Sequence, residues 1–106
     1  MPANKTSVVW SVRSERDLRE IWAYLIETAG SRAADEIVRR VVAATRKLAA
    51  HPRSGRSRDE IRKGLRSVSA PPFVVFYHVQ DNVVSIIRVI DGRRDLERMP
   101  FGDPNE

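Results

Sequence analysis

Two adjacent arginines near the C-terminus have the type and spacing that suit contact with a phosphate or with a protein partner. Residues 89–96 read VIDGRRDL, so Arg93 and Arg94 follow directly on an apolar run. Guanidinium groups stabilise negative charge on phosphates and carboxylates through paired hydrogen bonds. The sequence leaves three roles open: a catalytic device for RNA, a protein contact surface, or a strand end at which one arginine pairs with Asp91 or Asp95.

Arg88 lies inside the same apolar run. By the two-residue alternation of a strand it shares a face with Val84, Ile86 and Ile90. A charge on such a face must be paired or must lie at the rim. We therefore expect Arg88 either to anchor the strand or to join the two following arginines in a contact surface.

Residues 53–66 form a basic segment that reads RSGRSRDEIRKGLR, with six basic and two acidic residues and a local charge of +4. Its basic residues are Arg53, Arg56, Arg58, Arg62, Lys63 and Arg66. A basic loop that contains glycine can follow phosphates. No aromatic residues alternate with the arginines for base stacking, so direct nucleic-acid binding is less favoured than a solvated loop or an acidic protein partner.

Other site chemistries lack the residues they need. His51 and His78 are the only histidines, they fall in different predicted elements, and neither has a second metal ligand at a suitable spacing. The chain has no cysteine and no G-x-S-x-G motif, and Asp35 and Glu36 would point about 100° apart on a helix. We expect no metal, no cofactor and no catalytic triad.

Composition indicates one basic domain. The chain has 106 residues, with 19 lysines and arginines against 14 acidic residues and a net charge of +5. A chain of this length builds one core, and its charge suits an anionic partner. The N-terminal MPANKTSVVW lacks the apolar core of a signal peptide, and no apolar run approaches membrane-spanning length. We expect a single domain over residues 1–106, soluble and cytoplasmic.

The first elements are a short strand and a helix. Residues 7–12, SVVWSV, form the strand, and Ser14 with Asp17 resembles a capping box that starts the helix. The apolar face of this helix holds Leu18, Ile21, Trp22, Leu25 and Ala29, and Gly30 ends it. Its spacing places Trp22 in the core; an exposed Trp22 would belong to a partner surface instead.

A second, longer helix is predicted from Ser31 to Ala50, closed by His51-Pro52. One apolar stripe is formed by Ala33, Ile37, Val41, Ala44 and Leu48, and a second by Val38, Val42 and Ala49. The resulting arc is wider than one packing partner requires. Either the first helix or a molecule outside the chain covers the second stripe.

Three strands complete the pattern, at residues 65–69, 73–79 and 83–91, and Asp81-Asn82 has the chemistry of a tight hairpin between the last two. Both faces of residues 73–79 are apolar, which predicts a central strand. The order indicates an α+β fold: an N-terminal strand, a helical hairpin, and a three-stranded antiparallel meander, with the helices on one face of a twisted sheet. The other face has no predicted cover.

Four segments together resemble the ParE group of the RelE/ParE toxin superfamily, the toxins of bacterial type II toxin–antitoxin modules. They are SERDLREIWAYLIETAG, ADEIVRRVVAATRKLAAHPRSGR, GLRSVSAPPFVVFYHV and VVSIIRVIDGRRDL. The resemblance implies the fold given above. It also implies a ParD-like antitoxin, expected to be acidic, that lies across the apolar surface at Trp22, Val38 and Val42 and near Arg56 and Arg58.

For the target, the resemblance implies inhibition of DNA gyrase without catalysis by the chain itself, with Arg88, Arg93 and Arg94 in the toxic surface. RelE-like members instead cut mRNA on the ribosome with basic sheet residues and a C-terminal tyrosine. At those positions this sequence has Leu65, Ser67, Val74 and Pro100. The alternative of a ribonuclease would rest on Arg94 and a shifted Arg66, and a third reading is an interaction domain without toxicity.

Overall fold

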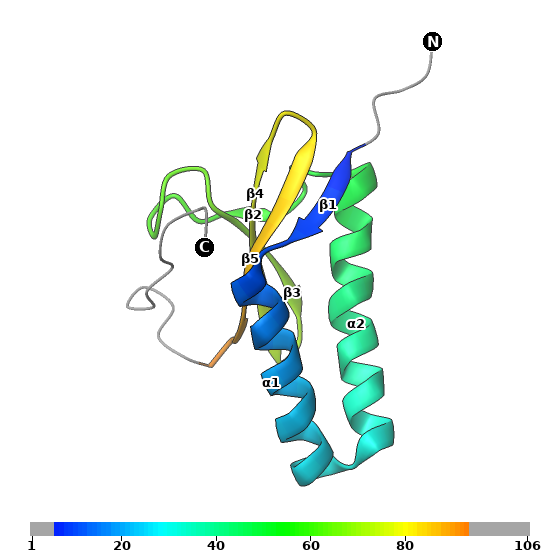
Figure 1. Ribbon diagram of the computed structural model, residues 1–106. Coiled ribbons are helices and arrows are strands. Elements are labelled where there is room, and N and C mark those ends of the chain that lie inside the picture. The colour runs from blue at the N-terminus through cyan, green and yellow to red at the C-terminus, as the bar shows by residue number, and fades with distance from the viewer. Residues whose placement is uncertain (1–5, 94–106) are drawn as a thin grey trace.

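The computed structural model describes residues 6–93, which form a five-stranded sheet with two helices on one of its faces (Figure 1). The elements in order are β1 (Ser7–Trp10), α1 (Val12–Ala29), α2 (Ser31–Ala50), β2 (Arg56–Ser57), β3 (Arg66–Ala70), β4 (Phe73–Gln80) and β5 (Val83–Asp91). The strands lie in the order β1-β5-β4-β3-β2, with β1 parallel to β5 and the other neighbours antiparallel. The predicted α+β class and element order are confirmed, and the two-residue edge strand β2 is an addition to them.

Strand β4 is the middle strand of the sheet, between β5 and β3, as its two apolar faces predicted. The hairpin from β4 to β5 turns at Asp81 and Asn82, whose φ angles are 51° and 60°. Two successive positive φ angles are the signature of a type I′ turn, which matches the twist of the flanking strands. The hairpin predicted from the Asp-Asn pair is therefore confirmed.

Helix α1 begins earlier than predicted, and the proposed capping box is wrong. Ser11 is the N-cap, and its Oγ accepts a hydrogen bond from the N–H of Ser14 at 3.0 Å. Ser14 and Asp17 are buried, and Ser14 Oγ donates to the carbonyl of Ile86 on β5 at 3.0 Å. Both polar side chains thus connect α1 to the sheet, and the preceding strand ends at Trp10 instead of residue 12.

Helix α2 spans the predicted residues, Ser31–Ala50. Val41 and Leu48 of its first stripe are buried against the sheet, together with Ala34 and Thr45, which the predicted stripe did not include. Of the helices within residues 6–93, none combines the length and the apolar character that crossing a membrane requires.

Apolar side chains are buried on both faces of the sheet. The helix-side cluster contains Leu25, Ala34, Val41, Leu48, Ala70, Phe73, Val75, Tyr77, Val84, Ile86 and Val89. The opposite-side cluster contains Leu65, Phe76, Ile87 and Ile90, with Ile61 and Val74 packed against it. Because Ile61 and Leu65 come from the loop between β2 and β3, that loop covers part of the face for which the sequence predicted no cover.

A bulge in β5 changes which residues share a face. The pairing between β4 and β5 passes from Phe76–Arg88 to Tyr77–Ile86, so Ile87 is an extra residue. An extra residue shifts the alternation by one. Ile86 therefore belongs to the helix-side cluster while Ile90 belongs to the opposite-side cluster, and the single face predicted for Val84, Ile86, Arg88 and Ile90 is wrong.

Tyr77 fixes the start of the basic segment to the sheet. Its side chain is fully buried, and its hydroxyl accepts a hydrogen bond from the N–H of Gly55 at 2.9 Å. Burial raises the pKa of Tyr77, and the hydrogen bond from Gly55 partly opposes that rise. A Cβ atom at Gly55 would meet the Tyr77 hydroxyl and lie 2.8 Å from the carbonyl oxygen of Ser67, so this position requires glycine.

Candidate protein-binding site

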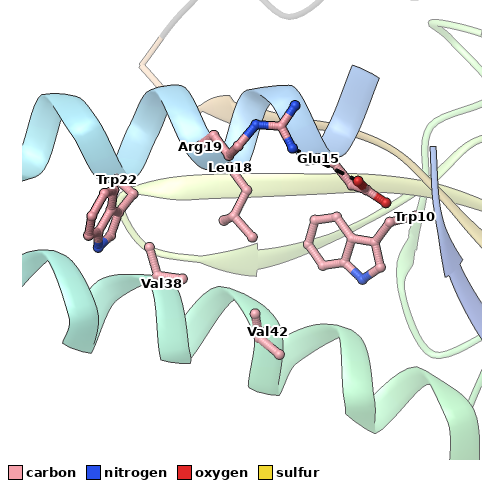
Figure 2. Close-up of a pocket in the computed structure, with 7 residues that line it drawn as sticks. All are labelled: Trp10, Glu15, Leu18, Arg19, Trp22, Val38 and Val42. Carbon is pink, nitrogen blue, oxygen red and sulfur yellow. Dashed lines mark ion pairs between the residues drawn. The ribbon is translucent and has the colours of Figure 1, made fainter. Parts of the chain in front are cut away.

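An apolar groove of about 470 Å³ runs between α1 and α2 on the outer side of the helical hairpin. It is lined by Trp10, Glu15, Leu18, Arg19, Trp22, Val38 and Val42. Figure 2 shows the side chains of Leu18, Val38 and Val42 between the two tryptophans, with the pair formed by Glu15 and Arg19 on the α1 side. Both tryptophans and the aliphatic residues offer an apolar surface with little polar area, a composition typical of a binding site.

The groove exists because α1 covers only part of the second stripe of α2. Val38 and Val42 are partly buried, and Trp22 remains 44% exposed. The indole Nε1–H of Trp22 donates to Asp35 Oδ1 at 3.0 Å, which holds the ring across the gap between the helices. The prediction that Trp22 packs in the core is therefore wrong, because its ring lies at the groove end and not against the sheet.

Arg56 and Arg58 lie away from the groove, in and beside β2. Arg56 is exposed on the edge strand. The side chain of Arg58 is 17% exposed: its Nε–H donates to Ser67 Oγ at 2.8 Å, and its guanidinium lies 6.0 Å from the ring centroid of Phe76. The predicted antitoxin residues thus form two separate sets, three in the groove and two at the far edge of the sheet.

Arg88 is buried, with 6% of its surface exposed, and is paired with Asp17 of α1. Its Nε and Nη2 groups donate to the Asp17 carboxylate at 2.8 and 3.2 Å, and the backbone N–H of Val89 donates to Asp17 Oδ2 at 3.0 Å. Strand β1 ends opposite Ile86, so Asp17 supplies an acceptor where β5 has no strand partner on that side. This buried pair fits the role of Arg88 as an anchor for β5, and not its role in a contact surface with the two following arginines.

Arg93 forms the ion pair that the sequence suggested as a structural alternative. Its Nη2 lies 2.6 Å from Asp91 Oδ2, and its Nε–H donates to Asp91 Oδ1 at 3.0 Å. The hydrogen bond and charge of Asp91 raise the pKa of the guanidinium. The Arg93 side chain is nevertheless 81% exposed, so it remains accessible to a partner. Arg94, the other predicted contact residue, lies outside the described residues.

Arg66, on which the ribonuclease alternative would rest, makes structural contacts instead, and Leu65 and Val74 stand at two of the positions where the ribonucleases have basic residues. Arg66 Nη1 donates to the carbonyls of Arg53 and Gly55 at 3.1 and 2.9 Å, which ties β3 to the preceding loop. Leu65 is 1% exposed and Val74 packs in the opposite-side cluster. Across the described part of the chain, no group of three His, Cys, Asp or Glu side chains is placed to hold a metal ion.

Comparison with known proteins gives the family of this chain. Residues 8–96 match the family model described as the ParE toxin of the type II toxin–antitoxin system parDE. The chain belongs to the ParE toxin family. Toxin ParE3 of Caulobacter vibrioides is 35% identical over 80 residues, which cover 76% of this chain and 80% of that protein. Toxin ParE1 of Mycobacterium tuberculosis is 35% identical over 89 residues, which cover 83% of this chain and 91% of that protein.

A more distant toxin and a solved structure complete the comparison. Toxin RelE2 of Caulobacter vibrioides is 34% identical over 82 residues, 77% of this chain and 90% of that protein. The solved chromosomal ParDE system from P. aeruginosa contains a chain with a TM-score of 0.73 at 21% identity, covering 82% of this chain and 96% of that one. This likeness shows that the two chains share a fold.

Sequence reasoning missed three residues of the ParE-family groove, Trp10, Glu15 and Arg19, and the role of Asp17 as the partner of Arg88. Trp10 was assigned only to a strand, although its position at the strand end, next to a helix, places it at the groove. Glu15 and Arg19 have the i,i+4 spacing of a helical ion pair, which was an available signal. Asp17 was assigned to a cap, and nothing local in the sequence connects it with Arg88, 71 residues away.

The first prediction concerns the anchor. Asp17→Asn should lower the free energy of unfolding by about 3–5 kcal/mol, because it leaves the buried Arg88 without its counterion. Urea denaturation followed by circular dichroism measures this change. Glu36→Gln is the matched control: it breaks an exposed pair with Arg40 and should cost less than about 0.5 kcal/mol. Equal, small effects of both substitutions would contradict the anchoring role.

The second prediction concerns Trp22. Trp22→Ala should cost about 1–2 kcal/mol of unfolding free energy, less than the roughly 3–5 kcal/mol typical of a core tryptophan, because its ring is 44% exposed. Tyr24→Ala, at a 63% exposed position of the same helix, is the control and should cost less. A loss of 3 kcal/mol or more at Trp22 would mean that the ring packs in the core after all.

Proposed function

We propose that this ParE-family chain is neutralised by a cognate antitoxin whose apolar side chains occupy the groove between α1 and α2, and that its cellular target is DNA gyrase. The groove is the observation that carries the antitoxin part. It places Trp22, Val38 and Val42 together with Trp10 in one apolar surface of about 470 Å³. Aromatic and aliphatic anchors clustered in a pocket are the usual centre of a protein interface.

Charge supports an acidic antitoxin. The chain carries a net charge of +5, and Arg56 is exposed on the edge strand β2. Opposite charges on the two partners speed association and fix the register of docking more than they raise affinity. An acidic segment that extends from the groove to the sheet edge would reach Arg56, whereas Arg58 is already engaged by Ser67 and Glu60.

Two observations support the proposal that the chain inhibits gyrase without catalysis: its membership of the ParE family, and the contacts of the residues at the positions of a ribonuclease site. Gyrase is the target that resemblance to ParE toxins implies, and the ParE model matches residues 8–96. The guanidinium of Arg66 is held by backbone carbonyls, and Leu65 and Val74 are apolar. These positions offer no set of general acids and bases for cutting RNA. On this proposal the exposed Arg93, with Arg94, contacts the target.

Two neighbouring residues of α2 test the antitoxin site. Val42→Glu places a charge in the groove, whereas Ala43→Glu places the same charge on the exposed side of the helix. The product of the adjacent gene should bind the Val42 variant at least about 30-fold more weakly, equivalent to about 2 kcal/mol, because the charge would be buried without a partner. Binding to the Ala43 variant should stay within about threefold of the unaltered protein in calorimetry.

Circular dichroism of both variants shows whether each is folded before binding is compared. If the antitoxin binds both variants as tightly as the unaltered protein, the groove is not its site. An isolated gene with no small acidic protein beside it would count against the module as a whole.

Expression in a bacterium, with and without the adjacent gene, tests the target. Without the antitoxin, growth should stop with a DNA-damage response while protein synthesis continues, and purified protein should promote gyrase-dependent cleavage of supercoiled plasmid. Arg93→Ala should weaken cleavage, because it removes an exposed guanidinium, and Arg40→Ala on α2 should not. Arrest in which translation halts first, with cut mRNA, would favour the ribonuclease instead.

A further inference from the structure

A second cavity, of about 280 Å³, lies on the sheet face that the helices leave uncovered. The loop between β2 and β3 forms one wall, and β4 and β5 form the other. Its lining residues are Arg62, Lys63, Gly64, Leu65, His78, Val79, Gln80 and Ile87. Leu65 and Ile87 belong to the opposite-side cluster, so the cavity has an apolar floor with polar groups around it. It shares no residue with the groove.

The charges that line this cavity are all positive. Arg62 and Lys63 contribute two cations, and no carboxylate is among the lining residues. Of the two acidic residues of the same loop, Asp59 does not line the cavity, but its Oδ1 accepts a hydrogen bond at 2.8 Å from the N–H of the lining residue Gly64. Glu60 pairs with Arg58 at 3.7 Å. Within residues 6–93, neither Arg62 nor Lys63 takes part in an ion pair.

Arg62 also has an unsatisfied donor. Its Nη1 is buried, and no described residue accepts a hydrogen bond from it. An enclosed guanidinium nitrogen without an acceptor costs free energy and calls for an explanation. An oxyanion next to the guanidinium would supply both an acceptor and a countercharge.

His78 adds an imidazole that responds to the same cations. Burial and, after it, the charge of Arg62 lower the pKa of His78. The lining contributes Arg62 and Lys63 as charged groups from the loop, whereas its residues from β5 and the rest of β4 are uncharged: Ile87, Val79 and Gln80. Ser85, which pairs with His78 across the hairpin, is also uncharged. Because the neighbours are cationic, an anion in the cavity would favour the protonated imidazole.

We propose that this cavity binds a phosphate group, held by the guanidinium of Arg62, the ammonium of Lys63 and the imidazole of His78. Two cations match the charge of a phosphate dianion, and the guanidinium, the ammonium and the protonated imidazole all offer N–H donors. The lining contains no Phe, Tyr or Trp on which bases would stack, so the proposal rests on charge and hydrogen bonds to the phosphate. The phosphate is therefore that of a small molecule or of a nucleic-acid backbone that is bound without reading its sequence. This proposal is independent of the toxin's target.

Nuclear magnetic resonance of the two histidines tests the site on the intact chain. The pKa of His78 should rise by about one unit when sodium phosphate replaces sodium chloride at equal ionic strength, which corresponds to about tenfold coupling between anion and proton. Sulfate, which stays a dianion across the titration, should have the same effect. His51, which is exposed and does not line the cavity, is the internal control and should not change.

Two arginine variants connect the effect with the cavity. Arg62→Ala should raise the pKa of His78 in the absence of phosphate, because a neighbouring cation is removed, and should abolish the further rise on addition of phosphate. Arg39→Ala removes the same charge from an exposed position on α2 and should leave both values unchanged. Circular dichroism confirms that each variant is folded.

The source of the phosphate follows from comparing inorganic phosphate with a DNA hairpin at equal phosphate concentration. A shift of His78 with inorganic phosphate identifies a small-molecule site, and a shift only with the hairpin identifies a nucleic-acid backbone. No shift with either probe would overturn the proposal. An equal shift with sodium acetate, or a shift that persists in the Arg62→Ala variant, would overturn it as well.

Discussion

The fold depends on a single buried carboxylate, that of Asp17. It accepts three hydrogen bonds from β5, two from the guanidinium of Arg88 and one from the backbone of Val89. A buried charge is tolerated only when it is paired and its hydrogen bonds are satisfied, and here both conditions are met within one contact. Since β1 stops opposite Ile86, this contact, and not a neighbouring strand, holds α1 to the second half of β5.

The ion pair between Asp17 and Arg88 lies between the two parts of the proposed functional surface, the groove and the exposed Arg93. On one side of α1, the groove is formed because this helix covers α2 incompletely and leaves Trp22 and Val42 accessible. On the other side, the strand that α1 holds ends at Asp91, which pairs with the exposed Arg93. Any movement of α1 relative to β5 would therefore change the width of the groove and the direction of the strand end together.

Local patterns predicted the elements well, and contacts between distant segments set the limits. Alternating apolar residues and the Asp-Asn pair were sufficient for β4, β5 and their hairpin. The sheet face on which Ile90 lies could not be predicted. The extra residue in β5 reverses the alternation of side chains between the two faces, and that extra residue is evident only from the pairing of β5 with β4. Trp22 has the spacing of a core residue, but its ring lies in the groove between α1 and α2 and stays 44% exposed. The period of one helix does not show how that helix packs on another. Val38 and Val42 could be recognised as residues of a contact surface because the apolar arc of α2 is wider than one packing partner requires.

The parallel pairing of β1 with β5 has a consequence for synthesis of the chain. Residues 7–10 pair with residues 83–86, and Asp17 forms its buried ion pair with Arg88, although Arg13, four residues away, also lies 3.5 Å from its carboxylate. A contact of such large sequence separation forms late, after the intervening chain is available. On a ribosome, the pairing of β1 and the ion pair between Asp17 and Arg88 can therefore form only once residues 83–88 have emerged, whereas α1 can already pack against α2. The order of the strands thus delays completion of the sheet until its last strand, β5, is available.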